Sequence, residues 1–368
     1  MDGDEMAKNK KSKGKRVALI IICALLIVGI GISATCVLFY LRAKNAAPQV
    51  EDTITYDFDA DETLPDEFSD DPEFDRIFEG DATALRARIK EWATNKGDIM
   101  YSGDVINVLC LGVDTRNKNT ISGLTDSMII VSINKKLGTI TFTSIMRDSY
   151  AYIESPSGKG SFNKINSAFP FYGVESLIGT IESHFKIRID GYAMINFAFF
   201  KAAIDKLGGV TVPVQKYEAD YINKMDGFHI EHGNAVTLNG DEALVFCRSR
   251  KCDVDGDVSR TRRQRAVLTG LLSKAGQISS SEIPEYVTTF MPYLETSYSE
   301  ADVISLGTKA VVGGWAGFKV QQLVMPDEKS RKAHSGSTWY WEVDYPLAAK
   351  TLQETIYGKS NIVLSDNR

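Results

Sequence analysis

The chain has 368 residues, of which 43% are hydrophobic, and its net charge of −6 is distributed very unevenly. This size and composition suffice for one large folded domain with a hydrophobic core. Residues 81–368 sum to only +1, so the folded part lacks the surplus of Lys and Arg that sequence-independent nucleic-acid binding requires. We therefore expect no nucleic-acid partner.

The first 41 residues have the pattern of a membrane anchor. Residues 1–16 carry six basic and three acidic residues, and residues 17–41 carry no charge. That apolar run exceeds the roughly 20 residues needed to cross a bilayer as a helix. The positive-inside rule then predicts a single-pass cell-membrane protein with a cytoplasmic N-terminus and an extracellular C-terminal domain. A cleaved signal peptide, the alternative, would have a shorter apolar region of about 7–15 residues.

Residues 42–80 are predicted to be an acidic extracellular linker. The stretch 46–80 holds thirteen acidic residues against Arg76 alone. Such a chain repels itself and stays extended, which is typical of a spacer between membrane and domain. Recruitment of divalent ions or of a basic partner is the alternative reading of the same charges.

Residues 81–368 are predicted to be one extracellular domain, with its core motifs within 105–275. In chain order, the patterns predict a helix over 82–95, strands over 106–113, 127–134 and 138–146, helices over 174–185 and 197–207, strands over 210–214 and 243–250, helices over 258–275, 283–292 and 300–312, a strand over 319–324 and a helix over 346–357. The fold class is therefore α/β, with a mixed central β-sheet flanked by helices on both faces.

The segment 243–275 combines arginines with apolar residues. Alternation in the strand predicted over 243–250 places two apolar residues and two arginines on one face: Leu244, Phe246, Arg248 and Arg250. In the following helix, a stripe begins with polar residues and continues with apolar ones: Arg260, Gln264, Val267, Leu268, Leu271 and Ala275. Both patterns predict an apolar interior whose mouth is lined by guanidinium groups. Arg263 is expected to flank this mouth, and Arg262 and Arg265 are expected to be solvated.

Arginines buried against an apolar wall require compensating anions. Guanidinium groups match phosphate oxygens in bidentate geometry, so the pattern favours a phosphate that carries a long hydrophobic tail. In the alternative, Arg248 and Arg250 pair only with the aspartates of the intervening turn: Asp253, Asp255 and Asp257.

Two aspartates flank the first pair of predicted strands. Asp114 follows the first strand and Asp126 precedes the second, so antiparallel pairing would bring both carboxylates to one edge of the sheet. Together with phosphate oxygens they would suit a magnesium ion. Aspartates at strand ends also occur as ordinary turn residues. The third strand is followed by Arg147 and Asp148, and the loop near 162–166 contributes Lys164.

An ordered set of motifs resembles the LytR-CpsA-Psr family of cell-envelope glycopolymer transferases. The matching stretches are NVLCLGVDTR (107–116), LTDSMIIVSIN (124–134), ITFTSIMRD (140–148), NKINSAF (163–169), IDGYAMINF (189–197), KLGGVTV (206–212) and the arginine-rich segment 238–264. The resemblance covers about residues 105–275 and implies an α-β-α sandwich. The anchor and the exported topology agree with it.

The resemblance implies transfer of a glycopolymer from a polyprenyl pyrophosphate carrier to a peptidoglycan acceptor. By this likeness Asp114 and Asp126 would hold Mg²⁺ or Mn²⁺. The remaining site residues would bind the pyrophosphate or support its binding: Arg147, Lys164, Arg248, Arg250, Asp257, Arg260 and Gln264. The sequence departs from the family at Cys247, where an apolar residue is usual; we expect this thiol to be buried and unpaired, and a bridge to Cys252 is the alternative.

Other functions fit the same residues. A phosphohydrolase would use the same cleft with water as the acceptor. A non-catalytic envelope regulator or lipid-binding protein would bind the lipid without turnover. No Ser-His-Asp or Cys-His arrangement is recognisable in the sequence, and no general base is identified.

Overall fold

The computed structural model describes residues 82–113, 125–249, 252, 257–275, 284, 287–288, 291, 294–334 and 339–364. The predicted cytoplasmic tail, membrane helix and linker therefore lie outside the described residues. Within the part of the chain that is described, no helix combines the length and the apolar character needed to span a membrane.

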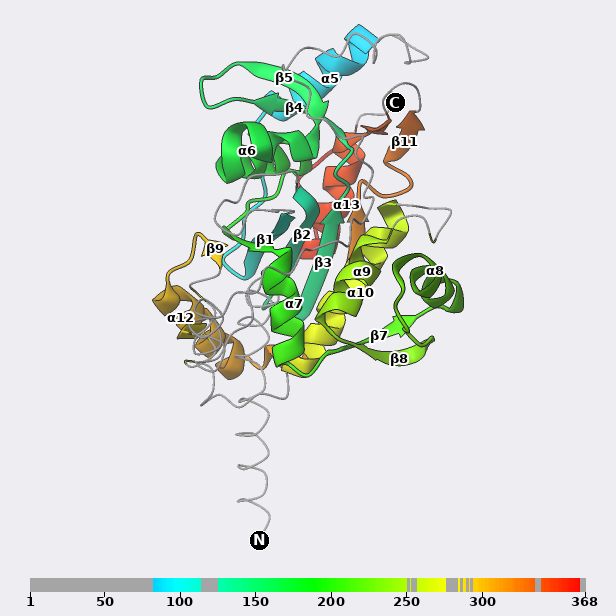
Figure 1. Cartoon of the computed structure of the whole chain (residues 1–368). Helices are drawn as coiled ribbons and strands as arrows, with labels where there is room; N and C mark the ends of the chain where they lie inside the picture. Colours follow the sequence, from blue (N-terminus) through cyan, green and yellow to red (C-terminus); the bar gives the residue numbers. More distant parts are fainter. Residues whose placement is uncertain are drawn as a thin grey trace, which may run out of the picture.

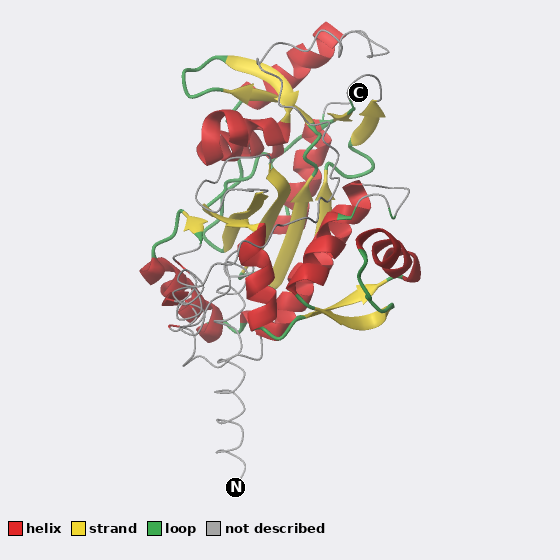
Figure 2. Ribbon diagram, viewed as in Figure 1, coloured by secondary structure: helices red, strands yellow, loops and turns green. Residues whose placement is uncertain are grey.

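A six-stranded mixed sheet forms the centre of the domain (Figures 1 and 2). Its strands are β1 (Val105–Val113), β2 (Thr125–Asn134), β3 (Thr139–Ile145), β6 (Gly191–Asn196), β9 (Glu295–Thr296) and β10 (Lys319–Met325), in the order β10-β3-β2-β1-β6-β9. The pairs β1–β2, β2–β3 and β6–β9 are antiparallel, and β1–β6 and β3–β10 are parallel. The central strands are buried on both faces, which explains their nearly continuous apolar sequences.

A hairpin turn joins β2 to β3, the second and third of the predicted strands. Asn134 closes the turn because its side-chain Oδ1 accepts hydrogen bonds from the backbone N–H groups of Lys136 and Leu137, at 2.9 and 2.8 Å. Gly138 follows with φ of 62°, a left-handed conformation that favours glycine. The turn therefore fixes the register that pairs Asn134 with Thr139.

Helices cover both faces of the sheet, as the sequence predicts (Figure 2). One face packs against α5 (Ala82–Thr94), α6 (Ala168–Phe185) and α13 (Tyr345–Tyr357). The other packs against α7 (Phe197–Lys206), α9 (Gly240–Arg248), α10 (Asp257–Ala275) and α12 (Glu300–Val312). Alternation along β1 serves both cores, since Val108 and Cys110 face the second group and Leu109 and Leu111 the first.

Three two-stranded sheets surround this sandwich. They are β4 (Tyr150–Glu154) with β5 (Gly160–Lys164), β7 (Val210–Val214) with β8 (Gly233–Leu238), and β11 (Arg331–His334) with β12 (Tyr340–Val343). Helix α8 (Lys216–Asp226) connects β7 to β8. Of these elements, the sequence patterns predict only β7.

The strand predicted over Ala243–Arg250 is wrong, because this segment forms helix α9. Asn239 caps the helix: its side chain accepts from the backbone N–H of Glu242, whose carboxylate accepts from the backbone N–H of Asn239. The buried positions Ala243, Phe246 and Cys247 have helical spacing. The expected face of two apolar residues and two arginines therefore does not exist. Cys247 is buried and unpaired, as expected.

Most of the other predicted elements are confirmed, including the three strands from 106 to 146 and the helix over 258–275. The predicted helix over 283–292 lies mostly outside the described residues.

Candidate functional site

Three segments that are far apart in the sequence meet at one edge of the central sheet. Arg147 and Asp148 follow the end of β3, Lys164 is the last residue of β5, and Asp257 and Arg260 lie in the first turn of α10. Because α10 starts where β3 ends, its positive N-terminal pole faces the same edge.

These five residues form one network of ion pairs. Lys164 Nζ lies 2.8 Å from Asp148 Oδ1, and Arg147 Nε lies 3.5 Å from Asp148 Oδ2. Arg147 Nε also lies 3.7 Å from Asp257 Oδ1, which pairs in addition with Arg260. Arg147 and Arg260 are only 6% and 2% exposed. The structure thus brings together four of the predicted site residues around Asp148, to which sequence reasoning gave no role.

The Asp148 carboxylate stays ionised in this network. Burial alone would raise its pKa, but Arg147 and Lys164 beside it outweigh that effect and hold the pKa below its ordinary value. Asp148 therefore keeps its negative charge at neutral pH and orients the two cations that contact it.

Two further predicted residues, Gln264 and Arg248, have contacts outside this network. The side-chain oxygen Oε1 of Gln264 accepts a hydrogen bond of 3.1 Å from Ser127 Oγ, which ties α10 to the start of β2. Arg248 ends α9, and its guanidinium carbon lies 4.3 Å from the ring centroid of Phe197 at the start of α7. An aromatic face holds a guanidinium in place while leaving its N–H groups at the edge.

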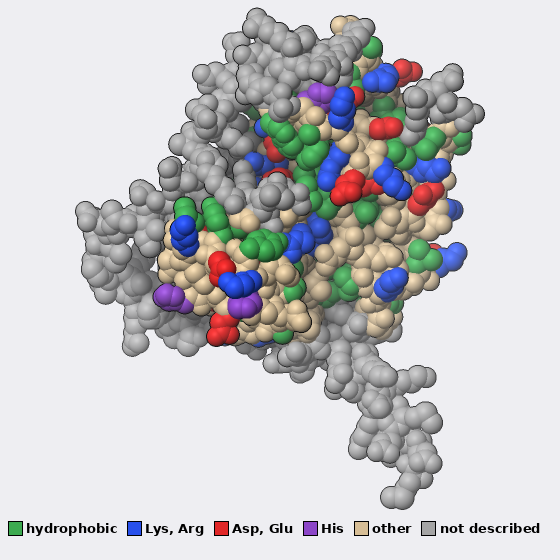
Figure 3. Space-filling model, turned by 90° about the vertical axis from the view of Figure 1, so that its right-hand side faces the viewer, with side chains coloured by type: hydrophobic (Ala, Val, Ile, Leu, Met, Phe, Trp, Pro, Cys, Tyr) green, Lys and Arg blue, Asp and Glu red, His purple; other side chains and the backbone are tan. Residues whose placement is uncertain are grey.

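The described part of the site carries a net positive charge. It contains the cations Arg147, Lys164, Arg248 and Arg260 and the anions Asp148 and Asp257, which together give +2. Elsewhere, on the face drawn in Figure 3, basic and acidic side chains are interspersed. A local surplus of cations in a domain of near-zero charge favours a compact anion such as a diphosphate.

The expected change from polar to apolar along α10 is confirmed. Arg260 and Gln264 lie at the charged end, and Val267, Leu268 and Leu271 are buried in the hydrophobic core behind it. The helix therefore leads directly from the ion-pair network into apolar surroundings.

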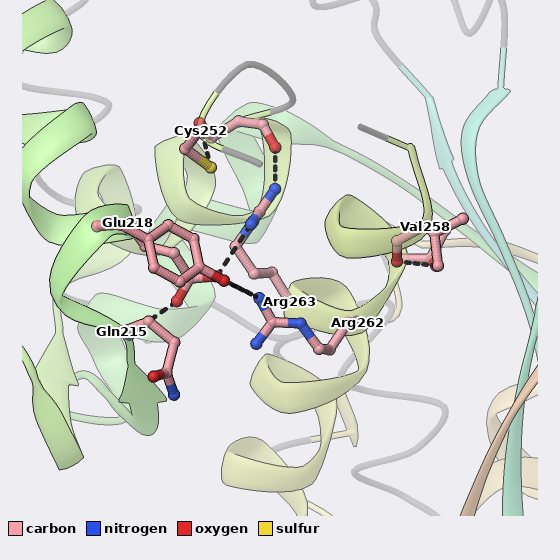
Figure 4. A network of polar contacts seen from close by, with 9 residues as sticks. Gln215, Glu218, Cys252, Val258, Arg262 and Arg263 are labelled. Carbon is pink, nitrogen blue, oxygen red and sulfur yellow. Dashed lines mark hydrogen bonds and ion pairs between the residues drawn. The ribbon is translucent and has the colours of Figure 1, made fainter. Parts of the chain in front are cut away.

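Arg263 does not flank the site as expected; it is completely buried. Figure 4 shows its side chain directed to Glu218. Its Nη1 lies 2.9 Å from Oε1 of Glu218, which is also completely buried, and its Nη2 donates to the backbone carbonyl of Ser249. Arg262 Nη2 contacts the same Glu218 oxygen at 2.5 Å. Glu218 in turn accepts a hydrogen bond of 2.8 Å from the backbone N–H of Gln215. No motif around Glu218 indicates this role from the sequence.

Arg265 was expected to be solvated, and this prediction is also wrong. Its side chain is buried, and Nη1 donates a 2.7 Å hydrogen bond to Ser144 Oγ on β3. Burial lowers its pKa to about 10, and Arg262 adds to the effect. In the helical repeat, Arg265 lies off the stripe formed by Arg260 and Gln264, which suggested exposure to solvent. The hydrogen bond to Ser144 shows that this position of α10 instead reaches β3.

The predicted metal ligands, Asp114 and Asp126, are not both among the described residues. Asp114 and Arg250 lie outside the described residues, and Asp126 is described only in its backbone, as part of β2. Gly112 pairs with Ser127 and Val113 with Thr125, so Asp126 is the extra residue of a β-bulge opposite the end of β1. Among the side chains that the structure does describe, no group of three or more His, Cys, Asp or Glu residues is placed to hold a metal ion.

Comparison with known proteins adds independent information. The model of the LytR_cpsA_psr family matches residues 79–356. A polyisoprenyl-teichoic acid–peptidoglycan teichoic acid transferase, TagU of Bacillus licheniformis, is 38% identical over 177 residues, which are 48% of this chain and 54% of the relative. TagU of Bacillus subtilis is 35% identical over 195 residues, or 53% and 58% of the two chains. The match thus spans little more than half the length of these relatives.

A solved structure shows the same architecture. The crystal structure of TagV of B. subtilis superposes with a TM-score of 0.54 at 26% identity, covering 70% of this chain and 98% of TagV. Since the family model extends over most of the chain and the ion-pair network falls within it, the chain belongs to the LytR_cpsA_psr family.

Proposed function

We propose that this protein is a phosphotransferase that moves a glycopolymer from a polyprenyl pyrophosphate carrier to peptidoglycan. The observation that carries the proposal is the buried network of Arg147, Asp257 and Arg260, with Lys164 beside it, at the start of a helix that continues into the apolar core. The relatives named as teichoic acid transferases support the same reaction class.

The site offers two adjoining environments for such a donor. Arg147, Lys164 and Arg260 would bind the pyrophosphate oxygens, and Arg248 and Arg250 would contribute two further cations. The polyprenyl chain would lie along the apolar part of α10, near Val267 and Leu271. Binding would thus combine charge-assisted hydrogen bonds with burial of apolar surface.

The reaction is a displacement at phosphorus. A hydroxyl of the acceptor sugar attacks the phosphorus atom that carries the glycan; the new P–O bond forms as the bond to the bridging oxygen breaks, and polyprenyl phosphate leaves. The hydroxyl proton passes to a base or to water. Arg147 and Arg260 are fixed by Asp257 and Asp148, so they stabilise the developing charge without reorganising.

A divalent cation, Mg²⁺ or Mn²⁺, is part of the proposal. Carboxylates supply the oxygen ligands that Mg²⁺ prefers. The antiparallel pairing of β1 with β2, on which the expectation of a shared site depends, supports the proposal. Asp114 and Asp126 would hold the ion, which would neutralise charge on the phosphate oxygens.

We also propose that the domain acts outside the cell. The apolar segment 17–41 would anchor it as a single-pass membrane protein, with residues 1–16 in the cytoplasm. The acidic linker 42–80 would hold the site near the membrane in which the carrier lipid resides. Carrier and acceptor would thus both be within reach.

The test uses the full chain in detergent with a polyprenyl pyrophosphate-linked glycan and purified peptidoglycan. Wild-type protein should form glycan-phosphate-peptidoglycan and release polyprenyl phosphate. Arg260→Ala should lower kcat/KM about tenfold or more, since it removes a charge-assisted contact. Arg188→Ala is the matched control: this arginine is mostly exposed and lies before β6, at the opposite edge of the sheet. Release of free glycan phosphate without acceptor would instead identify a phosphohydrolase, and lipid binding without turnover would identify a carrier.

A further inference from the structure

Two tryptophans and an arginine share one face of the β11–β12 hairpin. Trp339 directly precedes β12, and Trp341 lies two residues further on, so both side chains point to the same side of the strand. Their rings meet edge to face with centroids 4.6 Å apart. The guanidinium carbon of Arg331 lies 4.7 Å from the ring centroid of Trp341. We call Trp339, Trp341 and Arg331 the aromatic platform.

The aromatic platform is only partly buried, and Trp341 packs against the core with part of its surface. Trp339 and Trp341 are half-buried, whereas Trp315 is 3% exposed and belongs to the core. The residue opposite Trp341 on β11 is Ala333, which is exposed and too small to cover an indole. The Nε1 atom of Trp341 is buried, so the accessible part of its ring is carbon. The tryptophans therefore present apolar ring surface to the outside.

The aromatic platform lies next to the ion-pair network. The backbone N–H of Trp341 donates a 2.9 Å hydrogen bond to the carbonyl of Asp148, and Trp341 forms an isolated parallel bridge with Ser149. The neighbouring Tyr340 points the other way, and its ring centroid lies 5.5 Å from Lys164 Nζ. Figure 1 places β11 in the same upper part of the molecule as β4 and β5. One strand thus separates the tryptophans from the residues that would hold the pyrophosphate.

We propose that the aromatic platform binds a sugar ring of the donor glycan, beyond the sugar that is bonded to the pyrophosphate. The face of an indole carries negative charge density and attracts the C–H groups on the apolar face of a pyranose. The Arg331 guanidinium, which also donates to the carbonyl of Pro326 at 3.1 Å, lies beside the ring and can donate N–H groups to sugar hydroxyls.

The location favours the donor over the acceptor as the source of this sugar. The donor glycan is covalently tied to the pyrophosphate, so its next sugars stay at high local concentration around the site. Tyr340 and Lys164 lie on one side of β12 and the aromatic platform on the other, which matches a sugar one step removed from the phosphate. The inference rests on the proposed function and deepens it, because it makes the enzyme sensitive to glycan length.

The experiment measures the affinity of the full chain in detergent for polyprenyl pyrophosphate alone and for polyprenyl pyrophosphates that carry one or three N-acetylhexosamine residues. Trp339→Ala should weaken binding of the three-sugar donor about threefold to tenfold and leave the other two affinities unchanged. Trp339→Phe should recover most of the loss. Tyr101→Ala is the matched control, because Tyr101 also lies against an arginine, Arg188 at 5.0 Å, but precedes β1 at the opposite edge of the sheet.

The outcomes separate this inference from the proposed function. Failure of the wild-type chain to bind any of the three lipids overturns both. Equal weakening for all three lipids in Trp339→Ala shows a general structural role and overturns only the aromatic platform. A variant whose donor affinities are unchanged but whose KM for peptidoglycan rises assigns the platform to the acceptor, which also contradicts the inference.

Discussion

Arg263 and Glu218 form a completely buried ion pair, with Nη1 and Oε1 2.9 Å apart, that connects α10 to α8. The same guanidinium donates to the carbonyl of Ser249, the residue between Arg248 and Arg250. One pair therefore holds three elements together and fixes the backbone that carries two of the proposed pyrophosphate-binding arginines.

Replacing Glu218 should destabilise the domain strongly. Glu218→Ala leaves Arg263 buried without its carboxylate, which typically costs about 3–5 kcal/mol in the free energy of unfolding. Asp220→Ala is the matched control on the same helix, because Asp220 pairs with Lys216 at 2.6 Å on the exposed surface, where little change is expected. Denaturant unfolding of both variants measures the difference. Similar, small losses in the two would contradict a structural role for the buried pair.

Arg250→Ala should weaken binding of polyprenyl pyrophosphate about tenfold or more, because it removes a charge-assisted contact worth about 1.5–3 kcal/mol. Arg262→Ala provides the comparison: Arg262 lies on the same arginine-rich segment, but its side chain is 41% exposed and is directed to Glu218. Titration of both variants with polyprenyl pyrophosphate checks the prediction. Equal affinities for the two would remove Arg250 from the site.

The sheet and most of the helices could be predicted because their sequences satisfy local rules. β1 to β3 are rich in β-branched and apolar residues, and Asn134 and Gly138 specify the turn between β2 and β3. α9 was missed because the segment 243–250 also alternates in polarity, which favoured a strand; the capping box at Asn239 and Glu242 is the local signal for a helix that the prediction did not use. For this segment, the capping residues predict the secondary structure better than the alternation of polarity does.

The sequence predicts the site residues that belong to motifs within single strands or helices. The motif residues Arg147, Lys164, Asp257 and Arg260 come together because β3, β5 and α10 end or begin at one edge of the sheet. The partners that fix these residues come from other elements. Two cations, Arg147 and Lys164, converge on Asp148, and two arginines of α10 converge on Glu218 of α8. Neither relationship leaves a periodic signal in the sequence.

Asp126→Asn should raise the Mg²⁺ concentration required for transfer. Loss of one carboxylate weakens a two-carboxylate site but leaves the arginines that bind the pyrophosphate, so lipid binding should persist while turnover falls. Asp104→Asn, an exposed carboxylate just before β1, serves as the control. Transfer rates over a Mg²⁺ titration after chelation test this. Transfer that continues at full rate in excess chelator would exclude a divalent cation from the reaction.

Gly270→Ala should destabilise the packing of α10 on β7. A Cβ atom at Gly270 would lie 2.4 Å from the backbone carbonyl oxygen of Thr211, which cannot move without disturbing the strand. Gly179→Ala in α6 is the matched change: nothing lies within 4 Å of its Cβ position, so helix propensity should stabilise that variant by about 0.5–1 kcal/mol. Thermal unfolding should therefore shift in opposite directions. A neutral Gly270→Ala variant would show that the two elements separate easily.

His184 should make the domain sensitive to mild acid. Burial lowers the pKa of its imidazole from 6.5 to about 3; the hydrogen bond to the Thr180 carbonyl opposes this, and Lys186 adds to it. The backbone N–H of Tyr152 donates to Nε2 at 3.1 Å, which requires the neutral ring with its proton on Nδ1. A buried neutral ring thus connects β4 to α6.

The sign of the pH dependence follows from proton uptake. Below about pH 6.5 the unfolded chain binds a proton at His184 that the folded chain refuses until about pH 3, so protonation favours unfolding in that window. As the pH is lowered through this window, protonation of His184 should reduce the free energy of unfolding by about 1.4 kcal/mol for each pH unit. His184→Gln should reduce the slope measured by denaturant unfolding between pH 6 and pH 4, whereas His229→Gln, at an exposed position, should not. An unchanged slope in His184→Gln would mean that another group controls the acid sensitivity of the fold.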